Sequence, residues 1–372
     1  MRLLVAPDSF KGSLSASDAA AAIARGASRA LPGASVSTCA LADGGEGVGA
    51  VLAGTEAMIA RRALVTGPLG APVGATWWLS ADGRAAIIES AQAIGLGLVP
   101  ETERAPLRST TRGVGELLLA ALDAGATRIE VGLGGTATTD GGAGMAQALG
   151  VELVGASARV TAEELPRIRA ARVDSRDRRV ERVEILALTD VDSPLTGPLG
   201  AARVFGPQKG ASATDCERLD AALSRLEQVV GVPGVEPGDG AAGGLGWGLR
   251  VFAGARLVSG VERVLDAVGF DAKLDGVDLV ITGEGRLDAQ SARGKVVSGV
   301  LRRAARRGVP VVALVGAVDA SARELLDRGL AGWASLVSDR VTSVEAMTNA
   351  AALLERLADD YLRRWSGGGA SP

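Results

Sequence analysis

The sequence predicts an α/β fold made of two α/β domains with a cleft between them. The chain of 372 residues is too long for one typical domain. Apolar, β-rich runs alternate with helical patterns over most of its length, and this alternation changes character near residue 70 and returns near residue 275. We therefore expect a discontinuous first domain (1–70 plus 276–366) with a mostly parallel sheet, and an inserted second domain (71–275) with a mixed sheet and hairpins. Residues 367–372 are expected to form a disordered tail.

The first two elements have clear boundaries in the sequence. The run "RLLVA" at 2–6 predicts a buried strand. Residues 15–31 predict a helix in which Ser15 and Asp18 form a capping box, and Pro32 ends it.

Residues 57–99 depart from this alternation. They contain short strands separated by Gly-Pro and Asp-Gly turns, which is typical of antiparallel hairpins. Residues 231–248, "GVPGVEPGDGAAGGLGWG", are expected to form one long loop. The remaining predicted elements are strands at 34–42, 128–135, 183–191, 278–282 and 309–316, and helices after residue 47, near 112–124, from about 140, at 294–307 and from about 342. The last of these helices is opened by Thr342 and Glu345 as a capping box.

Composition excludes several classes of function. A net charge of −3 gives no reason to expect nucleic acid or a membrane surface as a partner. Two cysteines cannot build a disulfide framework or a zinc cluster. The apolar start is too short for a signal peptide, and no run reaches the roughly 18 apolar residues of a membrane span, so we expect a cytoplasmic protein. The sequence does not decide the oligomeric state, and a homodimer is among the assemblies it allows.

The chain contains no histidine, which excludes Ser-His-Asp chemistry, His-ligated zinc and a histidine general base. Lysine is also rare among the 40 basic residues: it occurs only at Lys11, Lys209, Lys273 and Lys295. All but Lys273 lie in glycine-flanked loops. A lysine retained in an arginine-dominated chain is typical of a point charge on phosphate, although chance placement is the alternative.

Five glycine-rich loops stand out, several of them where a predicted strand runs into a helix. They span 7–13, 42–47, 132–144, 189–210 and 282–295. Glycine allows backbone N–H groups to approach an anion closely, and open α/β sheets bind ligands at the carboxyl ends of their strands. Any one of these loops is explained equally well as a turn. Their clustering with three of the four lysines favours a binding role.

The fifth loop, "TGEGRLDAQSARGKV" at 282–296, ends in Gly-Lys but is not a Walker A motif. Ala289 occupies the position of the first required glycine, and Val296 follows the lysine. If this loop binds phosphate, it does so with a different spacing.

Carboxylates occur in the same loops as the lysines, namely at Asp8, Asp43, Glu46, Asp140, Asp190, Asp192, Glu284 and Asp288. Carboxylates together with anion-binding amides and lysines suit phosphoryl transfer, which needs Mg²⁺, cations on the phosphates and a proton acceptor. For any single Asp the competing explanation is a helix cap, and Asp140 is the first choice for that role.

The loop sequences resemble the bacterial glycerate kinase family that lacks a Walker A loop. The resemblance rests on "PDSFKGSLSA", "ADGGEG", "GGTATTDGG", "FGPQKGA", "GAAGGLGWG" and "TGEGRLDAQSARGK", which occur in this order over nearly the whole chain. It implies an ATP-dependent, Mg²⁺-requiring kinase for D-glycerate that usually gives 2-phosphoglycerate. Thr139 and Ser193 depart from the family pattern, which often has Asn there.

Together, the loops and the resemblance give a set of expected site residues. Asp190 or Asp288 is expected to accept the proton, and Lys11, Lys209, Lys295 and Arg286 to hold the ATP phosphates and the glycerate carboxylate, without a division among them. Metal ligands are expected among Asp43, Glu46 and Asp192. Further phosphate or substrate contacts are expected from Ser9, Gly44, Gly45, Gly134, Gly135, Thr136, Gly283 and Gly285.

Two alternatives remain at this point. An NAD(P)-dependent 2-hydroxyacid dehydrogenase is favoured by "GEGVGA" at 45–50, which fits G-x-G-x-x-A, but no ribose-binding acid follows about 20 residues later. A non-catalytic sugar-acid binding module is disfavoured by the acids in the loops, which would repel an anion unless a metal offsets them.

Overall fold

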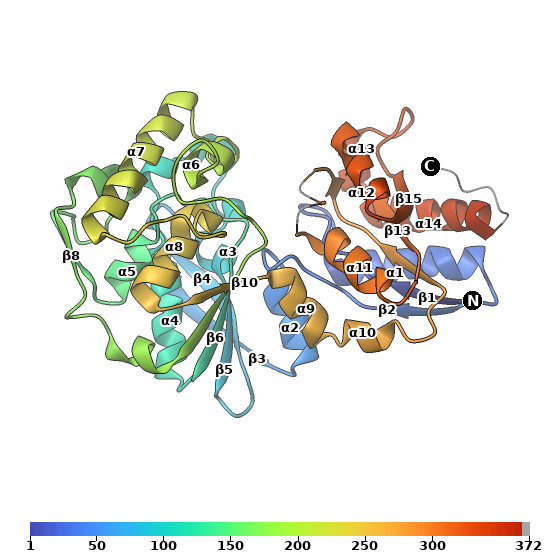
Figure 1. The fold of residues 1–372 in the computed structure, drawn as a ribbon, viewed down its shortest axis with the longest axis horizontal. Coiled ribbons are helices and arrows are strands. Elements are labelled where there is room, and N and C mark those ends of the chain that lie inside the picture. Colours follow the sequence, from blue (N-terminus) through green and yellow to red (C-terminus); the bar gives the residue numbers. More distant parts are fainter. Residues whose placement is uncertain (290, 293, 367–372) are drawn as a thin grey trace. The chain divides into compact units, whose positions relative to one another are not determined.

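The computed structural model describes residues 1–289, 291–292 and 294–366 and divides the chain into two compact units. Unit 1 comprises residues 1–43 and 261–372, and unit 2 comprises residues 44–260 (Figure 1). The changeovers lie at 43/44 and 260/261, whereas the sequence placed domain boundaries at 70/71 and 275/276. The predicted tail at 367–372 lies outside the described residues.

Unit 1 is built on a sheet of five parallel strands. The strand order is β15 (Leu330–Ser335), β13 (Val311–Val315), β11 (Leu279–Thr282), β1 (Arg2–Val5) and β2 (Ser35–Thr38). The central strands β11 and β13 are buried along their whole length, as expected for a parallel sheet with helices on both faces.

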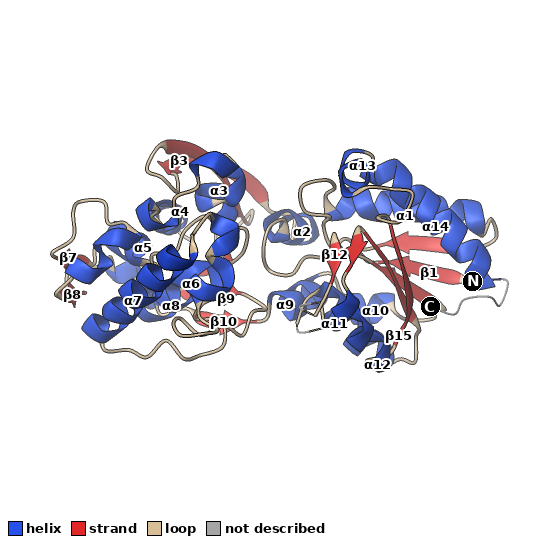
Figure 2. Ribbon diagram, turned by 90° about the horizontal axis from the view of Figure 1, so that it is seen from above, coloured by secondary structure: helices blue, strands red, loops and turns tan. Residues whose placement is uncertain are grey.

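Helices cover both faces of this sheet (Figure 2). One face carries α1 (Ala16–Ala30), α13 (Ser343–Thr348) and α14 (Ala350–Ser366); the other carries α10 (Phe270–Lys273), α11 (Val296–Ala305) and α12 (Glu324–Asp327). The predicted cap of α1 is confirmed, because the Ser15 hydroxyl accepts the N–H of Asp18 at 3.1 Å. The predicted capping box of α13, formed by Thr342 and Glu345, is confirmed as well.

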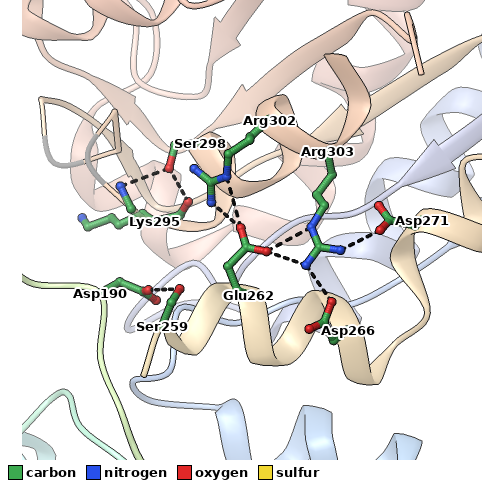
Figure 3. A network of polar contacts seen from close by, with 10 residues as sticks. Asp190, Ser259, Glu262, Asp266, Asp271, Lys295, Ser298, Arg302 and Arg303 are labelled. Carbon is green, nitrogen blue, oxygen red and sulfur yellow. Dashed lines mark hydrogen bonds and ion pairs between the residues drawn. The ribbon is translucent and has the colours of Figure 1, made fainter. Parts of the chain in front are cut away.

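An ion-pair network centred on the buried Arg303 joins three helices (Figure 3). The Arg303 guanidinium on α11 donates to Glu262 and Asp266 of α9 (Gly260–Ala267) and to Asp271 of α10. Three carboxylates around one arginine offset the cost of burying its charge. The network therefore holds α11 in place, and the 282–295 loop ends at Lys295, the N-cap residue of this helix.

Unit 2 is built on a six-stranded mixed sheet. Its order is β10 (Arg256–Val258), β9 (Glu184–Leu188), β6 (Arg128–Gly132), β5 (Ala85–Glu89), β4 (Pro72–Leu79) and β3 (Ile59–Thr66). The first four strands are parallel, and β5, β4 and β3 are joined as antiparallel hairpins. The predicted fold class, with a parallel sheet in one part and a mixed sheet with hairpins in the other, is confirmed.

The helices of unit 2 pack on this sheet and on one another. They are α2 (Val48–Thr55), α3 (Ser90–Ile94), α4 (Arg112–Asp123), α5 (Ala143–Ala148), α6 (Ala201–Phe205), α7 (Ala213–Val230) and α8 (Ala241–Ala253). Neighbouring residues of β4 serve the two faces of the sheet, because Trp77 belongs to the large core cluster while the Trp78 ring packs against Gly49 of α2.

Short elements complete the described chain. Two small sheets pair β7 (Glu152–Val154) with β8 (Ala170–Arg172), and β12 (Arg286–Leu287) with β14 (Ala317–Val318). Single 3₁₀ turns lie at Leu96–Leu98, Glu101–Glu103, Pro106–Arg108, Ala162–Arg167, Arg178–Arg182, Pro207–Lys209 and Ala320–Arg323.

The expectation of one long loop at 231–248 is only partly right. The helix α8 spans Ala241–Ala253, but Ala242, Gly243 and Gly244 have positive φ angles of 53°, 73° and 88°, so regular helix begins only after Gly244. Glycine also permits close packing here, because a Cβ on Gly243 would lie 2.0 Å from the Thr138 carbonyl oxygen and one on Gly248 would lie 2.7 Å from Gly142 Cα. Glycine content therefore correctly predicts irregular backbone up to Gly244, whereas at Gly248 it lets a helix approach the 141–142 backbone.

Within the described part of the chain, none of the helices combines the length and the apolar character that crossing a membrane requires.

Candidate active-site residues

The carboxyl ends of four parallel strands of unit 1 carry adjacent loops that are tied together through the backbone. The Asp8 N–H donates to the Gly283 carbonyl at 2.8 Å, which joins the loops after β1 and β11. The Gly316 N–H donates to the Glu284 carbonyl at 3.1 Å, and the Val337 N–H donates to the Gly316 carbonyl at 2.9 Å. The loops after β11, β13 and β15 are thereby linked in turn, at the edge where open α/β sheets bind ligands.

These loops enclose a pocket of about 370 Å³ that lies wholly within unit 1. Seven of the expected site residues line it: Ser9, Lys11, Asp43, Gly285, Arg286, Asp288 and Lys295. The sequence motifs that contain them are far apart in the chain, so the parallel sheet is what assembles them. Asp8 and Glu284 also line the pocket. Both are among the loop acids of the sequence, but no specific role was predicted for either.

Acidic and basic side chains lie close together in this pocket. The Lys11 ammonium lies 3.6 Å from the Asp43 carboxylate. Asp8 is only 3% exposed, and burial together with the Asp43 charge raises its pKa well above the ordinary range. Burial also raises the pKa of Glu284, to about 7, against the opposing effect of Lys295. The pocket therefore holds carboxyl groups whose ionisation a bound cation would favour.

Two polar atoms of the pocket have no hydrogen-bond partner among the residues that the structure describes. They are the Oε1 atom of Glu284, whose residue is 5% exposed, and the Oγ atom of Ser9. An unsatisfied buried acceptor costs free energy that a ligand or its cation can recover.

The lysine-containing loop is anchored at the start of α11. Lys295 is the N-cap residue, and its carbonyl accepts the Ser298 hydroxyl at 2.9 Å (Figure 3). The same hydroxyl accepts the Gly294 N–H at 3.1 Å. Asp288 and Ser291 cap each other's backbone N–H groups at 3.1 and 3.2 Å. These contacts fix the backbone at Asp288 and at Lys295, two of the charged residues that line the pocket.

Gly283 lies next to the pocket but does not line it. A Cβ at this position would lie 2.1 Å from the Leu314 carbonyl oxygen of β13, so this glycine lets two neighbouring strands run close together. The structure gives it a packing role, and its expected contact with phosphate or substrate stays a prediction.

The other expected residues lie in unit 2. Most of them are on loops that follow parallel strands, whereas Lys209 ends the 3₁₀ turn Pro207–Lys209. A Cβ on Gly134 would lie 2.6 Å from Gly45 Cα, so the loops at 44–47 and 132–136 touch through their backbones. Gly44 and Gly135 adopt positive φ angles of 80° and 64°, which L side chains rarely adopt. The Glu46 carboxylate lies beside Gly135. The Gly135 carbonyl accepts the Leu96 N–H at 2.7 Å, and Thr136 forms a β-bridge with Gly95.

Lys209 is buried inside unit 2 and is 2% exposed. Its Nζ donates to the Thr138 carbonyl at 2.6 Å and to the Thr136 hydroxyl at 3.4 Å. Burial lowers the pKa of Lys209 to about 7, although the Asp140 charge acts in the opposite direction. The hydroxyls of Thr138 and Thr139 are buried and have no hydrogen-bond partner among residues 1–289, 291–292 and 294–366.

Asp140 stabilises the start of α5 by accepting N–H groups there, although the N-cap residue itself is Gly142 and not Asp140. Its buried carboxylate accepts the N–H groups of Thr111, Gly142 and Gly144 at 2.8 to 3.1 Å, just before α5. Burial raises the pKa of this carboxyl group against these hydrogen bonds. Asp140 thus fixes the loop that also contacts Lys209.

Asp190 and Asp192 follow β9 on one loop but differ in their surroundings. The Asp190 carboxylate accepts the Ser259 hydroxyl at 2.6 Å (Figure 3), whereas Asp192 is exposed. Among residues 1–289, 291–292 and 294–366, no group of three or more Asp, Glu or Cys is placed to hold a metal ion by itself. Mg²⁺ usually takes only one or two carboxylates and completes its shell with phosphate oxygens and water, so the pocket carboxylates fit it.

The site includes acids whose importance a simple sequence pattern does not reveal. Asp8 lies on the loop shortly after β1 (Arg2–Val5) and Glu284 on the loop shortly after β11 (Leu279–Thr282), which places both at the ligand edge of the sheet. Glu89 ends β5, and its buried carboxylate accepts the N–H groups of Gly47 and Gly49 at 3.0 and 3.3 Å. Nothing in the local sequence of Glu89 distinguishes it from an ordinary strand residue.

The fold and the pocket define an α/β protein whose strand-end loops are built to hold a charged small molecule. Comparison with known proteins gives the particular family. Residues 3–366 match the model of the glycerate kinase family. The chain is 44% identical to glycerate kinase of Bacillus subtilis (strain 168), covering 97% of this chain and 96% of that protein. It is 43% identical to glycerate 2-kinase of Escherichia coli (strain K12), covering 94% of each chain.

A solved structure agrees over the whole chain. A crystal structure of a protein assigned as glycerate kinase 2 from Salmonella typhimurium LT2 superposes with a TM-score of 0.78 at 41% identity, covering 99% of both chains. This chain belongs to the glycerate kinase family.

Proposed function

We propose that this protein is an ATP-dependent kinase that phosphorylates D-glycerate, giving 2-phosphoglycerate, with Mg²⁺ as the metal on the ATP phosphates. Membership of the glycerate kinase family supports the activity. The observation that carries the proposal is the pocket of unit 1, in which Lys11, Arg286 and Lys295 stand among buried carboxyl groups. Cations and carboxylates in one pocket are the groups that phosphoryl transfer requires when no histidine is present.

The chemistry of each pocket residue indicates its task. Lys11, Arg286 and Lys295 supply positive charge for phosphate oxygens or the glycerate carboxylate. Asp43 is the expected metal ligand in unit 1, and bound Mg²⁺ would neutralise charge on the phosphates. Glu46 and Asp192 remain candidate ligands from unit 2. The glycines at 44–45, 134–135 and 285, with Ser9 and Thr136, remain candidate phosphate or substrate contacts.

A carboxylate is the expected proton acceptor for the glycerate hydroxyl. Asp288 lines the pocket of unit 1, and Asp190 lies on the loop after β9 of unit 2 with its carboxylate oriented by Ser259. Either one satisfies the chemical requirement for a base that takes the proton as the bond to phosphorus forms. Lys209 is proposed to take part in catalysis from its buried position in unit 2, beside Thr136 and Thr138.

The dehydrogenase alternative loses its main support in the structure. A dinucleotide fingerprint needs its glycines inside a β-α-β unit of one parallel sheet. Here the "GEGVGA" segment joins β2, which belongs to the sheet of unit 1, to α2 and then β3, which pairs antiparallel with β4 in the sheet of unit 2. The segment therefore lies outside any such unit.

Measuring ADP release with D-glycerate, with and without Mg²⁺, tests the proposal. ADP should form only when both are present, and ³¹P NMR of the product should show phosphate on the 2-hydroxyl. Binding of D-glycerate without turnover would favour the sugar-acid binding module, and NAD(P)H formation would favour the dehydrogenase. Light scattering on the purified chain tests the homodimer, and cell fractionation tests the expected cytoplasmic location.

A further inference from the structure

The pocket of unit 1 has an apolar side as well as a charged one. The charged side comprises the loops after β1 and β11. The apolar side, here called the apolar wall, is formed by Leu336, Val337, Ala346, Met347 and Ala317, from the loops after β13 and β15 and from α13. Backbone hydrogen bonds from Leu336 and Val337 to Val315 and Gly316, both at 2.9 Å, hold the wall against the strand ends.

The wall is too extensive for a small hydroxy acid. Glycerate is a three-carbon molecule whose carbon atoms all bear oxygen, so it has no apolar surface to place against five aliphatic side chains. A volume of about 370 Å³ lies in the range of pockets that hold ligands the size of a nucleotide. A nucleobase offers a flat surface with little charge, which matches the wall.

We infer that the unit 1 pocket is the nucleotide site, with the adenosine part of ATP against the apolar wall and its phosphates among Lys11, Arg286 and Lys295. The inference rests on the proposed function and assigns one of its two substrates to a place. It leaves the hydroxy acid to other residues of the chain, foremost the polar loops of unit 2.

Two features of the charged side support the phosphate end of this arrangement. The buried Glu284 Oε1 atom and the Ser9 Oγ atom belong to pocket-lining residues and have no hydrogen-bond partner in the described part of the chain. A phosphate oxygen can accept the Ser9 hydroxyl, and a metal ion on the phosphates can bind the Glu284 carboxylate. A metal–nucleotide complex therefore meets both requirements at once.

Met347 links the two sides of the pocket. It is 55% exposed although it is a large apolar residue. Its Cε atom lies 3.4 Å from where a Cβ on Gly12 would be, so it borders the 7–13 loop, which carries Ser9 and Lys11. An exposed methionine at the rim of a pocket adapts its shape to an apolar ligand. Truncating it should weaken contacts with the base without disturbing the charged groups.

Binding to the full chain in the absence of glycerate tests the inference. Calorimetry with Mg²⁺ and a non-hydrolysable ATP analogue measures the whole ligand, and Mg²⁺ with inorganic tripolyphosphate measures the phosphate part alone. Met347→Ala should weaken binding of the analogue about five- to tenfold, in line with the loss of a buried apolar contact, and change tripolyphosphate affinity less than twofold. Lys295→Met should weaken both ligands.

Val344→Ala is the matched control, because Val344 lies on the same helix, is 74% exposed and does not line the pocket. It should leave both affinities unchanged. The inference is overturned if the analogue does not bind wild-type protein without glycerate, or if Met347→Ala has no effect or weakens both ligands equally. The proposed function fails separately, through absence of ADP release with D-glycerate in a wild-type protein that still binds the analogue.

Discussion

The Lys209 Nζ atom donates to the Thr138 carbonyl at 2.6 Å, and both residues are buried inside unit 2. The lysine thereby holds the segment 136–140, whose other end is fixed by the carboxylate of Asp140. The segment lies directly after the glycines at 134–135. We expect Lys209 to position these glycines, besides any contact that it makes with substrate.

The first prediction concerns the pH dependence of stability. The pKa of Lys209 is lowered by burial from 10.5 to about 7, so between these values the unfolded chain binds a proton that the folded chain does not. The free energy of unfolding should therefore rise with pH across this window as far as Lys209 is concerned, by up to on the order of 1 kcal/mol for each pH unit. Lys209→Met should lack this rise.

Denaturant unfolding of wild type and Lys209→Met at several pH values between about 7 and 10 measures the difference, in which the contributions of other groups cancel. Lys273→Met is the control, because Lys273 is exposed and its removal should leave the pH profile unchanged. A constant difference between wild type and Lys209→Met would contradict the assignment of a largely neutral Lys209 above pH 7.

The second prediction concerns Lys295 as a charge on phosphate. Lys295→Met should lower turnover with D-glycerate by at least about 100-fold, which is the typical loss on removing one preorganised charge contact from an active site. Lys273→Met should have nearly normal kinetics. Near-normal turnover of a folded Lys295→Met protein would show that Lys295 does not serve this role.

The third prediction tests the contact between two glycine loops. Gly134→Ala places a Cβ 2.6 Å from Gly45 Cα, where only backbone can yield, so it should destabilise the protein by about 1–3 kcal/mol and lower activity. Gly54→Ala is the matched control in α2: nothing lies within 4 Å of its Cβ, and alanine should stabilise the helix by about 0.5–1 kcal/mol. Thermal unfolding compares them, and equal effects at both positions would mean that the close contact is unimportant.

The sequence predicts those features that depend on local patterns. The apolar runs locate β1, β9, β11 and β13, and the capping residues Ser15 and Thr342 locate two helix starts, although only Thr342 forms the full predicted capping box. The same pattern at Ser212 and Asp215 forms the capping box that begins α7, a helix start that was not predicted. Glycine was misleading only in the regular part of α8, because Gly243 and Gly244 do adopt left-handed backbone, whereas Gly248 is helical and serves close contact with Gly142.

The composition of the site was harder to predict than its loops. Seven expected residues line one pocket because parallel strands end at one edge, which chain order already implies. Burial, in contrast, depends on tertiary packing. It separates Glu284, with its unpartnered oxygen, from exposed Asp192, although both appear in the sequence as acids in glycine-rich loops.

The last prediction concerns the proton acceptor. Because the chain has no histidine, the acidic limb of the pH–rate profile should belong to a carboxylate, and activity should fall as that group is protonated. Asp190→Asn and Asp288→Asn each remove one charge and keep the shape of the side chain. The variant that lacks the base should lose turnover by about 100-fold or more, keep its affinity for the ATP analogue and lose the acidic limb.

A metal ligand would behave differently in the same assay, because raising the Mg²⁺ concentration restores part of the activity when a ligand is lost but not when the base is lost. Asp190 is the favoured base, because it follows a core strand and its carboxylate is oriented by Ser259. Loss of turnover in Asp288→Asn alone would move the base to the pocket of unit 1. If both variants keep more than about a tenth of wild-type turnover, neither is the base, and Asp43, which lines the pocket beside Lys11, becomes the candidate.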